Sequence, residues 1–212
     1  MRPHLVLLPR HDGTAPLRRA FQGFSLIEVL VAVIVVSVGL LGVAKLHAIS
    51  KRTNLEAVQL THAAVLAQDL LERMRSNPLS LAVYTSDGAG RTITGAPAAP
   101  GTNCGAVVCT DVQVAAYDLA VWWQTVSGAA EQSGGNSVGG LVAPTACITG
   151  ASGGSGRYRV ALAWRSTMPL SNPAIDACGQ GSGLYDLTTG AGTQPDVYRR
   201  VIVITAHIAE PT

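Results

Sequence analysis

The part of the sequence that decides the fold is Gly23-Phe24-Ser25-Leu26-Ile27-Glu28-Val29, continued by Leu30-Val31-Ala32-Val33-Ile34-Val35-Val36-Ser37-Val38-Gly39-Leu40-Leu41-Gly42-Val43-Ala44. Glu28 is the only charged residue between Phe24 and Ala44. An apolar helix of about 20 residues, rising about 1.5 Å per residue, is long enough to cross a hydrocarbon layer of about 30 Å. The sequence therefore predicts one membrane-spanning helix over residues 24–44.

Glu28 has no basic partner inside this span, because the next basic residue is Lys45. A carboxylate at the centre of a bilayer costs roughly 2.5–3.5 kcal/mol on insertion scales. One interpretation is an uncleaved signal anchor that keeps Glu28 near the membrane interface. The other is cleavage after Gly23, which makes Phe24 a positively charged amino terminus four residues from Glu28 on the same helix face. Glu28 would then pair with that amine or with the amine of a neighbouring copy, and the helix dipole favours an acid at this end.

The stretch from Gly23 resembles the prepilin signature of type IV pilins and of type II secretion pseudopilins, with glycine, aromatic residue, acid and apolar run in register. The resemblance implies that a prepilin peptidase cuts between Gly23 and Phe24, that Phe24 becomes N-methylphenylalanine, and that Glu28 guides docking into a filament. It also implies other minor and major pilins and an inner-membrane assembly platform as partners. The implied location is the inner membrane, as a single-pass protein with a periplasmic C-terminal domain, and then a pilus on the cell surface.

Residues 1–23 are predicted to be the leader peptide and are set aside from the fold. Arg18 and Arg19 directly before the span favour a cytoplasmic amino terminus. The leader holds four arginines against one aspartate, so its removal changes the formal charge from +2 to about −1. That balance does not support a nucleic-acid partner.

Beyond the span the apolar residues fall on one face of a helix, with the i, i+3, i+4, i+7 spacing of an amphipathic segment. These residues are Leu60, Ala63, Ala64, Ala67, Leu70, Leu71 and Met74. No proline occurs between Phe24 and Asn77, and Pro78 disfavours helical geometry in the residue before it. The sequence thus predicts one long helix over residues 24–77, with Asp69 and Arg73 paired at i, i+4.

Two further segments resemble the PilV-type minor pilins, also called type IV pilus modification proteins. The first is Ala67-Gln68-Asp69-Leu70-Leu71-Glu72-Arg73-Met74-Arg75-Ser76-Asn77-Pro78, and the second is Ala115-Ala116-Tyr117-Asp118-Leu119 followed by Trp122. Type II secretion pseudopilins share the apolar helix but match the first segment less well. The resemblance implies a minor pilin that incorporates into type IV pili or primes their assembly.

Residues 78–212 are predicted to form a periplasmic or extracellular globular domain. Three stretches rich in glycine, serine, threonine or proline have little to bury. They are residues 79–110 and 169–195, expected as loops, and residues 127–156, expected to be mobile or irregular apart from a short strand at 145–149.

The regular elements of this domain are expected between those stretches. Asp111–Val126 suggests a second helix capped by Thr110 or Asp111. The turns of this helix are spanned by Val114, Tyr117, Asp118, Val121 and Trp122, and its aromatic residues are expected to form a core-facing stripe. Alternation predicts strands over residues 157–165 and 197–208. A small antiparallel sheet resting on the C-terminal half of the long helix gives an α+β, type IV pilin-like fold.

All the cysteines follow the span: Cys104, Cys109, Cys147 and Cys178. Four cysteines allow three pairings, and export to an oxidising periplasm favours disulfides. We favour Cys104 with Cys109 and Cys147 with Cys178, the latter closing a loop of about 30 residues worth a few kcal/mol. A metal site would need Cys-x-x-Cys spacing or nearby histidines, and the sequence has neither.

No pattern in the sequence supports catalysis. Gly150-Ala151-Ser152-Gly153-Gly154 matches G-x-S-x-G formally, but it lies in a Gly/Ser tract without a strand–turn–helix pattern. Asp176, Asp186 and Asp196 are too dispersed for a calcium loop. We expect no catalytic residue, cofactor or metal, and a structural protein rather than an enzyme. The alternatives are a minor pseudopilin of type II secretion and a monomeric, membrane-anchored periplasmic binding domain.

Overall fold

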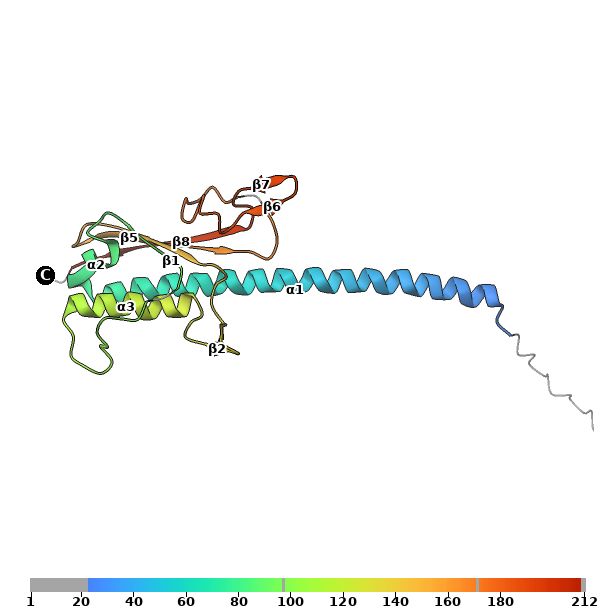
Figure 1. The fold of residues 1–212 in the computed structure, drawn as a ribbon, viewed down its shortest axis with the longest axis horizontal. Coiled ribbons are helices and arrows are strands. Elements are labelled where there is room, and N and C mark those ends of the chain that lie inside the picture. The colour runs from blue at the N-terminus through green and yellow to red at the C-terminus, as the bar shows by residue number, and fades with distance from the viewer. Residues whose placement is uncertain (1–22, 97, 171, 211–212) are drawn as a thin grey trace, which may run out of the picture. The chain divides into compact units, whose positions relative to one another are not determined.

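The computed structural model describes residues 23–96, 98–170 and 172–210, so the predicted leader lies outside the described residues except for Gly23. The chain has an α+β fold in which a long first helix is followed by a helix-and-sheet domain, as predicted (Figure 1). It divides into two compact units, Met1–His47 and Ala48–Thr212. Each unit is described by itself.

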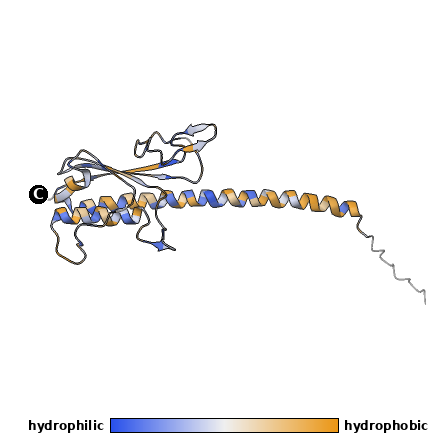
Figure 2. Cartoon of the chain, viewed as in Figure 1, coloured by the Kyte–Doolittle hydropathy of each residue, from blue (hydrophilic) through white to orange (hydrophobic). Residues whose placement is uncertain are grey.

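Helix α1 runs from Leu26 to Ser76 and contributes to both units. It begins two residues later than predicted, because Ser25 is the last residue before the helix and its carbonyl accepts the N–H groups of Glu28 and Val29. In the first unit the side chains of α1 are exposed and mostly apolar (Figure 2). By length and composition this helix could cross a membrane.

In the second unit one face of α1 is buried. The buried residues are Gln59, Ala63, Leu66, Ala67, Leu70, Leu71 and Met74. Five of the seven predicted residues are buried, namely Ala63, Ala67, Leu70, Leu71 and Met74, whereas Leu60 is 49% exposed and Ala64 is only partly buried. Gln59 and Leu66 are buried as well.

The prediction of a loop over residues 79–110 was wrong in its first half. A turn of 3-10 helix at Pro78–Ser80 leads into the short helix α2, Leu81–Thr85, and then into strand β1, Arg91–Thr94. Leu81 and Tyr84 are fully buried, and β1 pairs with a strand far along the chain. Long-range pairing and burial outweigh the local composition here.

Helix α3 runs from Asp111 to Val126, as predicted, and Thr110 is its N-cap. Thr110 and Gln113 form a capping box, with 2.9 Å between the Thr110 nitrogen and the Gln113 side-chain oxygen. The buried face consists of Ala115, Leu119, Trp122, Trp123 and Val126. Of the aromatic residues expected to face the core, Trp122 is buried and Tyr117 is partly buried. The Trp122 indole N–H donates to the Leu66 carbonyl of α1 at 2.8 Å and thereby orients this face towards α1.

The main sheet has the strand order β1-β4-β5-β8, and every pair is antiparallel. Strands β4 (Thr145–Thr149), β5 (Gly156–Arg165) and β8 (Arg199–Ile208) lie within one residue or two of the predicted strands. Val160 and Leu162 of β5 stand opposite Ile204 and Ile202 of β8 and form the core with α1 and α3.

Two small hairpins lie in segments whose composition predicts a mobile or irregular stretch (residues 127–156) and a loop (residues 169–195). One joins β2 (Gln132–Ser133) to β3 (Asn136–Ser137), and the other joins β6 (Leu187–Thr189) to β7 (Gly192–Gln194). The turn of the first is Gly134-Gly135, and both glycines have positive φ. A two-residue glycine loop of this kind is a hairpin signal that composition alone hides.

The four cysteines form two disulfides, Cys104–Cys109 and Cys147–Cys178. The second joins β4 to the connection between β5 and β8. Cys178 is buried with Ala161, Ala163 and Tyr185 in a small cluster separate from the main core. This cluster fixes the long β5–β8 connection to the sheet.

Candidate functional site

The predicted processing site lies at the start of the described chain. Gly23 and Phe24 precede α1 and are exposed, Phe24 at 83%. Nothing lies within 4 Å of a Cβ placed on Gly23, and its φ is not in the glycine-favouring region. Neither packing nor backbone geometry in the described structure therefore requires glycine at position 23.

Glu28 lies in the first turn of α1, where the helix dipole favours a carboxylate. Its side chain is exposed and forms no ion pair with any described residue. Beside it runs a shallow groove of about 480 Å³. The groove is lined by Phe24, Glu28, Val29, Ala32, Val33, Val36 and Ser37. Glu28 is thus an unpaired acid at the end of an apolar helix face.

The second group of polar residues joins α1 to α3. Arg73 donates to Asp69 at 2.9 Å, as the i, i+4 spacing predicted, and also to Asp118 of α3 at 3.1 Å. The Tyr84 hydroxyl donates to the other Asp118 oxygen at 2.8 Å. The Asn77 side-chain amide donates to the Asp111 carbonyl at 2.7 Å. The two segments with PilV-type resemblance therefore contact each other through Arg73 and Asp118.

The contacts of this junction shift the pKa values of its side chains. Burial lowers the pKa of Arg73, but the hydrogen bonds and charges of Asp69 and Asp118 outweigh it and raise the pKa above its usual value. Burial, followed by the hydrogen bond to Asp118, raises the pKa of Tyr84. Asp118 thus remains the shared acceptor of a charged and a neutral donor. Sequence reasoning missed Asn77, Tyr84 and the role of Asp118, because no local spacing connects them to Arg73.

Glu56 makes a third contact, which no pattern in the sequence predicts. Its Oε1 accepts from the Ser166 hydroxyl (2.8 Å), the Thr167 N–H (2.7 Å) and the Thr167 hydroxyl (2.8 Å), all just after β5. Its Oε2 lies 3.8 Å from Arg200 of β8. Burial raises the pKa of Glu56, but these donors and the Arg200 charge outweigh it, so the pKa is lowered overall. Glu56 therefore ties α1 to the end of the sheet as a carboxylate.

Arg199 organises the connection between β5 and β8. It is fully buried, and its guanidinium donates to the carbonyls of Asp176 and Cys178 at 2.8 Å and to the Asn172 side chain at 2.9 Å. Asp196, also buried, accepts from the Gly181 N–H at 3.0 Å. Burial lowers the pKa of Arg199, and the nearby Asp196 charge opposes this effect. Arg199 is thus an internal cation surrounded by main-chain acceptors.

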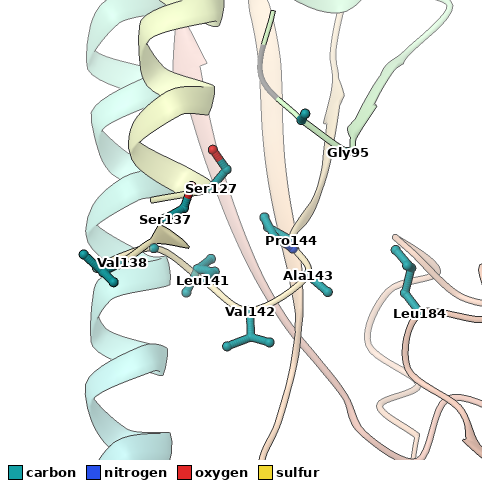
Figure 3. Close-up of a pocket in the computed structure, with 12 residues that line it drawn as sticks. Gly95, Ser127, Ser137, Val138, Leu141, Val142, Ala143, Pro144 and Leu184 are labelled. Atoms are coloured by element: carbon teal, nitrogen blue, oxygen red, sulfur yellow. The ribbon is translucent and has the colours of Figure 1, made fainter. Parts of the chain in front are cut away.

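A cavity of about 670 Å³ lies beside the C-terminal end of α3 (Figure 3). Its walls are the connection before β4, with Val138, Val142 and Pro144, together with Leu184 and the region after β1 at Gly95. No charged or imidazole side chain lines it. A site for acid–base or nucleophilic catalysis needs such groups, so this cavity offers none. Within residues 23–96, 98–170 and 172–210, no cluster of His, Cys, Asp and Glu could hold a metal ion.

Comparison with known families gives two matches. Residues 18–44 match the prokaryotic N-terminal methylation motif, and residues 46–120 match the Tt1218-like family, described as type IV pilin Tt1218. No curated protein and no solved structure matches the chain. The second match covers the part of α1 in the second unit, α2, β1 and most of α3, which includes the Arg73–Asp118 junction.

The chain thus combines a pilin-like α+β fold with the N-terminal methylation motif of residues 18–44. Over residues 46–120 the chain is similar to the type IV pilin Tt1218. The expectation that it is not an enzyme is confirmed by this family. The motif implies processing by a prepilin peptidase and assembly with other pilins, and a membrane or pilus location is typical of such proteins.

Proposed function

We propose that the chain is a minor pilin, which enters type IV pili or primes their assembly after a prepilin peptidase cuts between Gly23 and Phe24. The observation that carries the proposal is Glu28, an unpaired acid at the end of an otherwise apolar helix face. Cleavage creates an ammonium on Phe24, and this is the charge that Glu28 lacks. In a filament, Glu28 accepts the methylated Phe24 amine of a neighbouring subunit while the apolar spans pack together.

Gly23 supports the cleavage step. The described structure does not require glycine at this position. A glycine here instead suits a peptidase that must bind the extended chain closely. Residues 1–23 are then the leader, residues 24–44 cross the inner membrane, and residues 78–212 form the domain on the periplasmic side. After assembly the domain is displayed on the pilus.

The minor-pilin assignment rests on the PilV-type resemblance of the two segments around Arg73 and Asp118. Their contact gives that resemblance a physical basis, because a pair on α1 and α3 is needed only if these helices pack in this way. The partners are other minor and major pilins and the inner-membrane assembly platform. A type II secretion pseudopilin shares the processing motif, so the experiment below also measures secretion.

The assembly step is tested with Glu28→Ala in the native host. We expect normal cleavage and membrane insertion, but at least a tenfold loss of the subunit from sheared pili, because the filament would bury an ammonium without its acid. Thr53→Ala on the same helix is the matched control and should assemble normally, since Thr53 lies outside the span and only donates to its own helix at Ile49. Equal incorporation of the Glu28 variant would contradict the proposal.

The class of machine is tested by deleting the gene. Loss or reduction of surface pili with intact protein secretion is expected. Loss of secretion with normal pili would instead assign the chain to the pseudopilins.

A further inference from the structure

Cys178 lies in the long connection between β5 and β8 and belongs to none of the described strands. Its disulfide partner, Cys147, is held on both sides by strand pairing, because it stands opposite Ala161 of β5 and Thr92 of β1. The native bond therefore joins a position that the sheet fixes to a position in a loop. Side chains of the sheet and of the loop itself hold that second position.

Both main-chain groups of Cys178 are bound by charged side chains. Its N–H donates to Asp176 Oδ1 at 2.6 Å, and its carbonyl accepts from Arg199 Nη1 at 2.8 Å. Arg199 is the first residue of β8 and is fully buried. Hydrogen bonds with an ionised partner are roughly twice as strong as neutral ones. Cys178 is thus attached to the sheet by two strong contacts in addition to its disulfide.

Asp176 is itself held by two arginines. Its second carboxylate oxygen pairs with Arg159 of β5, and its carbonyl accepts from Arg199 Nη1 at 2.8 Å. The Asp176 side chain is only 11% exposed. Arg199 also donates to the Asn172 side chain at 2.9 Å and to the Pro173 carbonyl. We call Arg159, Asp176 and Arg199 the ionic clamp.

The ionic clamp does not need the disulfide in order to form. Its contacts join guanidinium groups to a carboxylate and to main-chain carbonyls, and none of them involves a sulfur atom. The Tyr185 hydroxyl attaches the same connection to β4 by donating to Thr145 at 2.8 Å. The connection can therefore take its folded path, with Cys178 beside Cys147, while both cysteines are still thiols.

We propose that the ionic clamp positions Cys178 for pairing with Cys147 and so selects this bond over bonds to Cys104 or Cys109. Four cysteines allow three pairings, and the other two would join both Cys147 and Cys178 to the loop before α3. Holding two reactive groups together raises their effective concentration, which favours the bond between them. The ionic clamp acts while the domain folds, so its role does not depend on the proposed pilus function.

The bond forms by thiol–disulfide exchange with a disulfide oxidant, for which oxidised glutathione serves as the probe. One of the two cysteine thiolates attacks glutathione disulfide, which releases one glutathione and leaves a mixed disulfide. The other thiolate attacks the cysteine sulfur of that mixed disulfide and releases the second glutathione. The two cysteines lose two electrons and two protons, and the oxidant is reduced to two thiols. The ionic clamp favours the second step.

The test measures the equilibrium of the Cys147–Cys178 bond with glutathione in the detergent-solubilised full chain. Peptide mass spectrometry also identifies which cysteines pair after reduction and reoxidation. Arg199→Met should lower the equilibrium constant by about tenfold and increase non-native pairing, because Cys178 loses a charge-assisted hydrogen bond. Asp176→Ala should do the same, and it decides the outcome if Arg199→Met does not fold.

Two control variants separate positioning from general stability. Arg157→Met removes an exposed arginine of β5 that forms no ion pair with a described residue, and it should leave the equilibrium unchanged. Asp118→Ala weakens the junction of α1 with α3, which shares no residue with the cluster around Cys178. At a temperature where circular dichroism shows every variant folded, Asp118→Ala should keep the equilibrium constant within about twofold of wild type.

A lower equilibrium constant in the variants of the ionic clamp alone would support the proposal. An unchanged constant and native pairing in folded Arg199→Met and Asp176→Ala would overturn it. An equal fall in Asp118→Ala would also overturn it, because the bond would then follow the overall stability of the domain rather than the position of Cys178.

Discussion

Glu28 and Glu56 are both carboxylates on α1, and their surroundings give them opposite properties. Glu28 has no ion-pair partner among the described residues, so its charge is available to another molecule. Glu56 is surrounded by donors from Ser166, Thr167 and Arg200, so its charge is used within the domain. We therefore propose a role in assembly for Glu28 and a role in stability for Glu56.

Glu56 predicts a pH dependence of folding. Its pKa in the folded protein is below the ordinary value of 4.5, so the unfolded chain takes up a proton first as the pH falls. The contribution of Glu56 is complete above that ordinary value and is lost as the pH falls through the lower folded pKa. Glu56→Gln should lower the free energy of unfolding at pH 7 by about 2 kcal/mol, the magnitude of hydrogen bonds to a charged group.

Denaturant unfolding of the detergent-solubilised full chain at several pH values measures the free energy of unfolding of both proteins. The difference between wild type and Glu56→Gln should shrink at acidic pH below 4.5. Glu72→Gln, at an exposed pair, is the control and should shift stability by less than about 0.5 kcal/mol at any pH. A constant difference down to the acid transition would contradict the role of the carboxylate.

Asp118 is the second residue whose substitution is expected to destabilise the domain. Asp118→Ala leaves Arg73 and Tyr84 without their shared acceptor, and its side chain is only 16% exposed. Loss of a partly buried network of this kind should destabilise the domain by about 2–4 kcal/mol. Tyr84→Phe removes only one donor and should cost about 1 kcal/mol. Thermal unfolding checks both, and equal effects of the two variants would show that Asp118 does not hold the pair together.

At the scale of elements, α3 shows what the sequence could predict and what it could not. Its bounds and its Thr110 cap follow from local chemistry and were predicted correctly. Its buried face was predicted only in part, because Trp122 is buried as expected but Tyr117 is only partly buried and Trp123 is buried as well. The contact that decides is the Trp122 hydrogen bond to Leu66, which lies 56 residues earlier in the chain. Strand β1 and the contacts of Glu56 were not predicted for the same reason, because their partners are also distant in sequence.

Substitution of Trp122 therefore tests how α3 packs on α1. Trp122→Ala removes a fully buried side chain and leaves the Leu66 carbonyl without its donor. The expected loss is about 3–5 kcal/mol. Val112→Ala, on an exposed side chain of the same helix, should change stability by less than about 0.5 kcal/mol. Similar melting temperatures for the two variants would mean that α3 does not contribute its indole face to the core.

At the scale of the whole molecule, the two disulfides constrain loops of very different size. Cys147 and Cys178 are separated by 31 positions, and Cys104 and Cys109 by five. The chain-entropy relation gives about 3–4 kcal/mol for the first loop and about 2 kcal/mol for the second. Cys147→Ser with Cys178→Ser should therefore destabilise the domain more than Cys104→Ser with Cys109→Ser. Denaturant unfolding of the two double variants checks the order, and the reverse order would contradict it.

The proposed processing site is the part of the chain where the sequence is most informative, because its residues are consecutive. The glycine, the aromatic residue and the acid lie within Gly23–Glu28, and residues 18–44 match the methylation motif. The surfaces of the domain could not be predicted in this way. A groove between α1 and β8 is lined by residues far apart in the sequence, so it forms only when α1 and the sheet pack together.

The most direct test of the central claim is the intact mass of the chain purified from native membranes and pili. The account predicts the mass of residues 24–212 with both disulfides formed and one added methyl group, and fragmentation should place that methyl on the Phe24 nitrogen. Gly23→Ala should instead give a precursor that begins before residue 24 and stays in the membrane. A functional, assembled subunit that still carries residues before Phe24 would contradict the account.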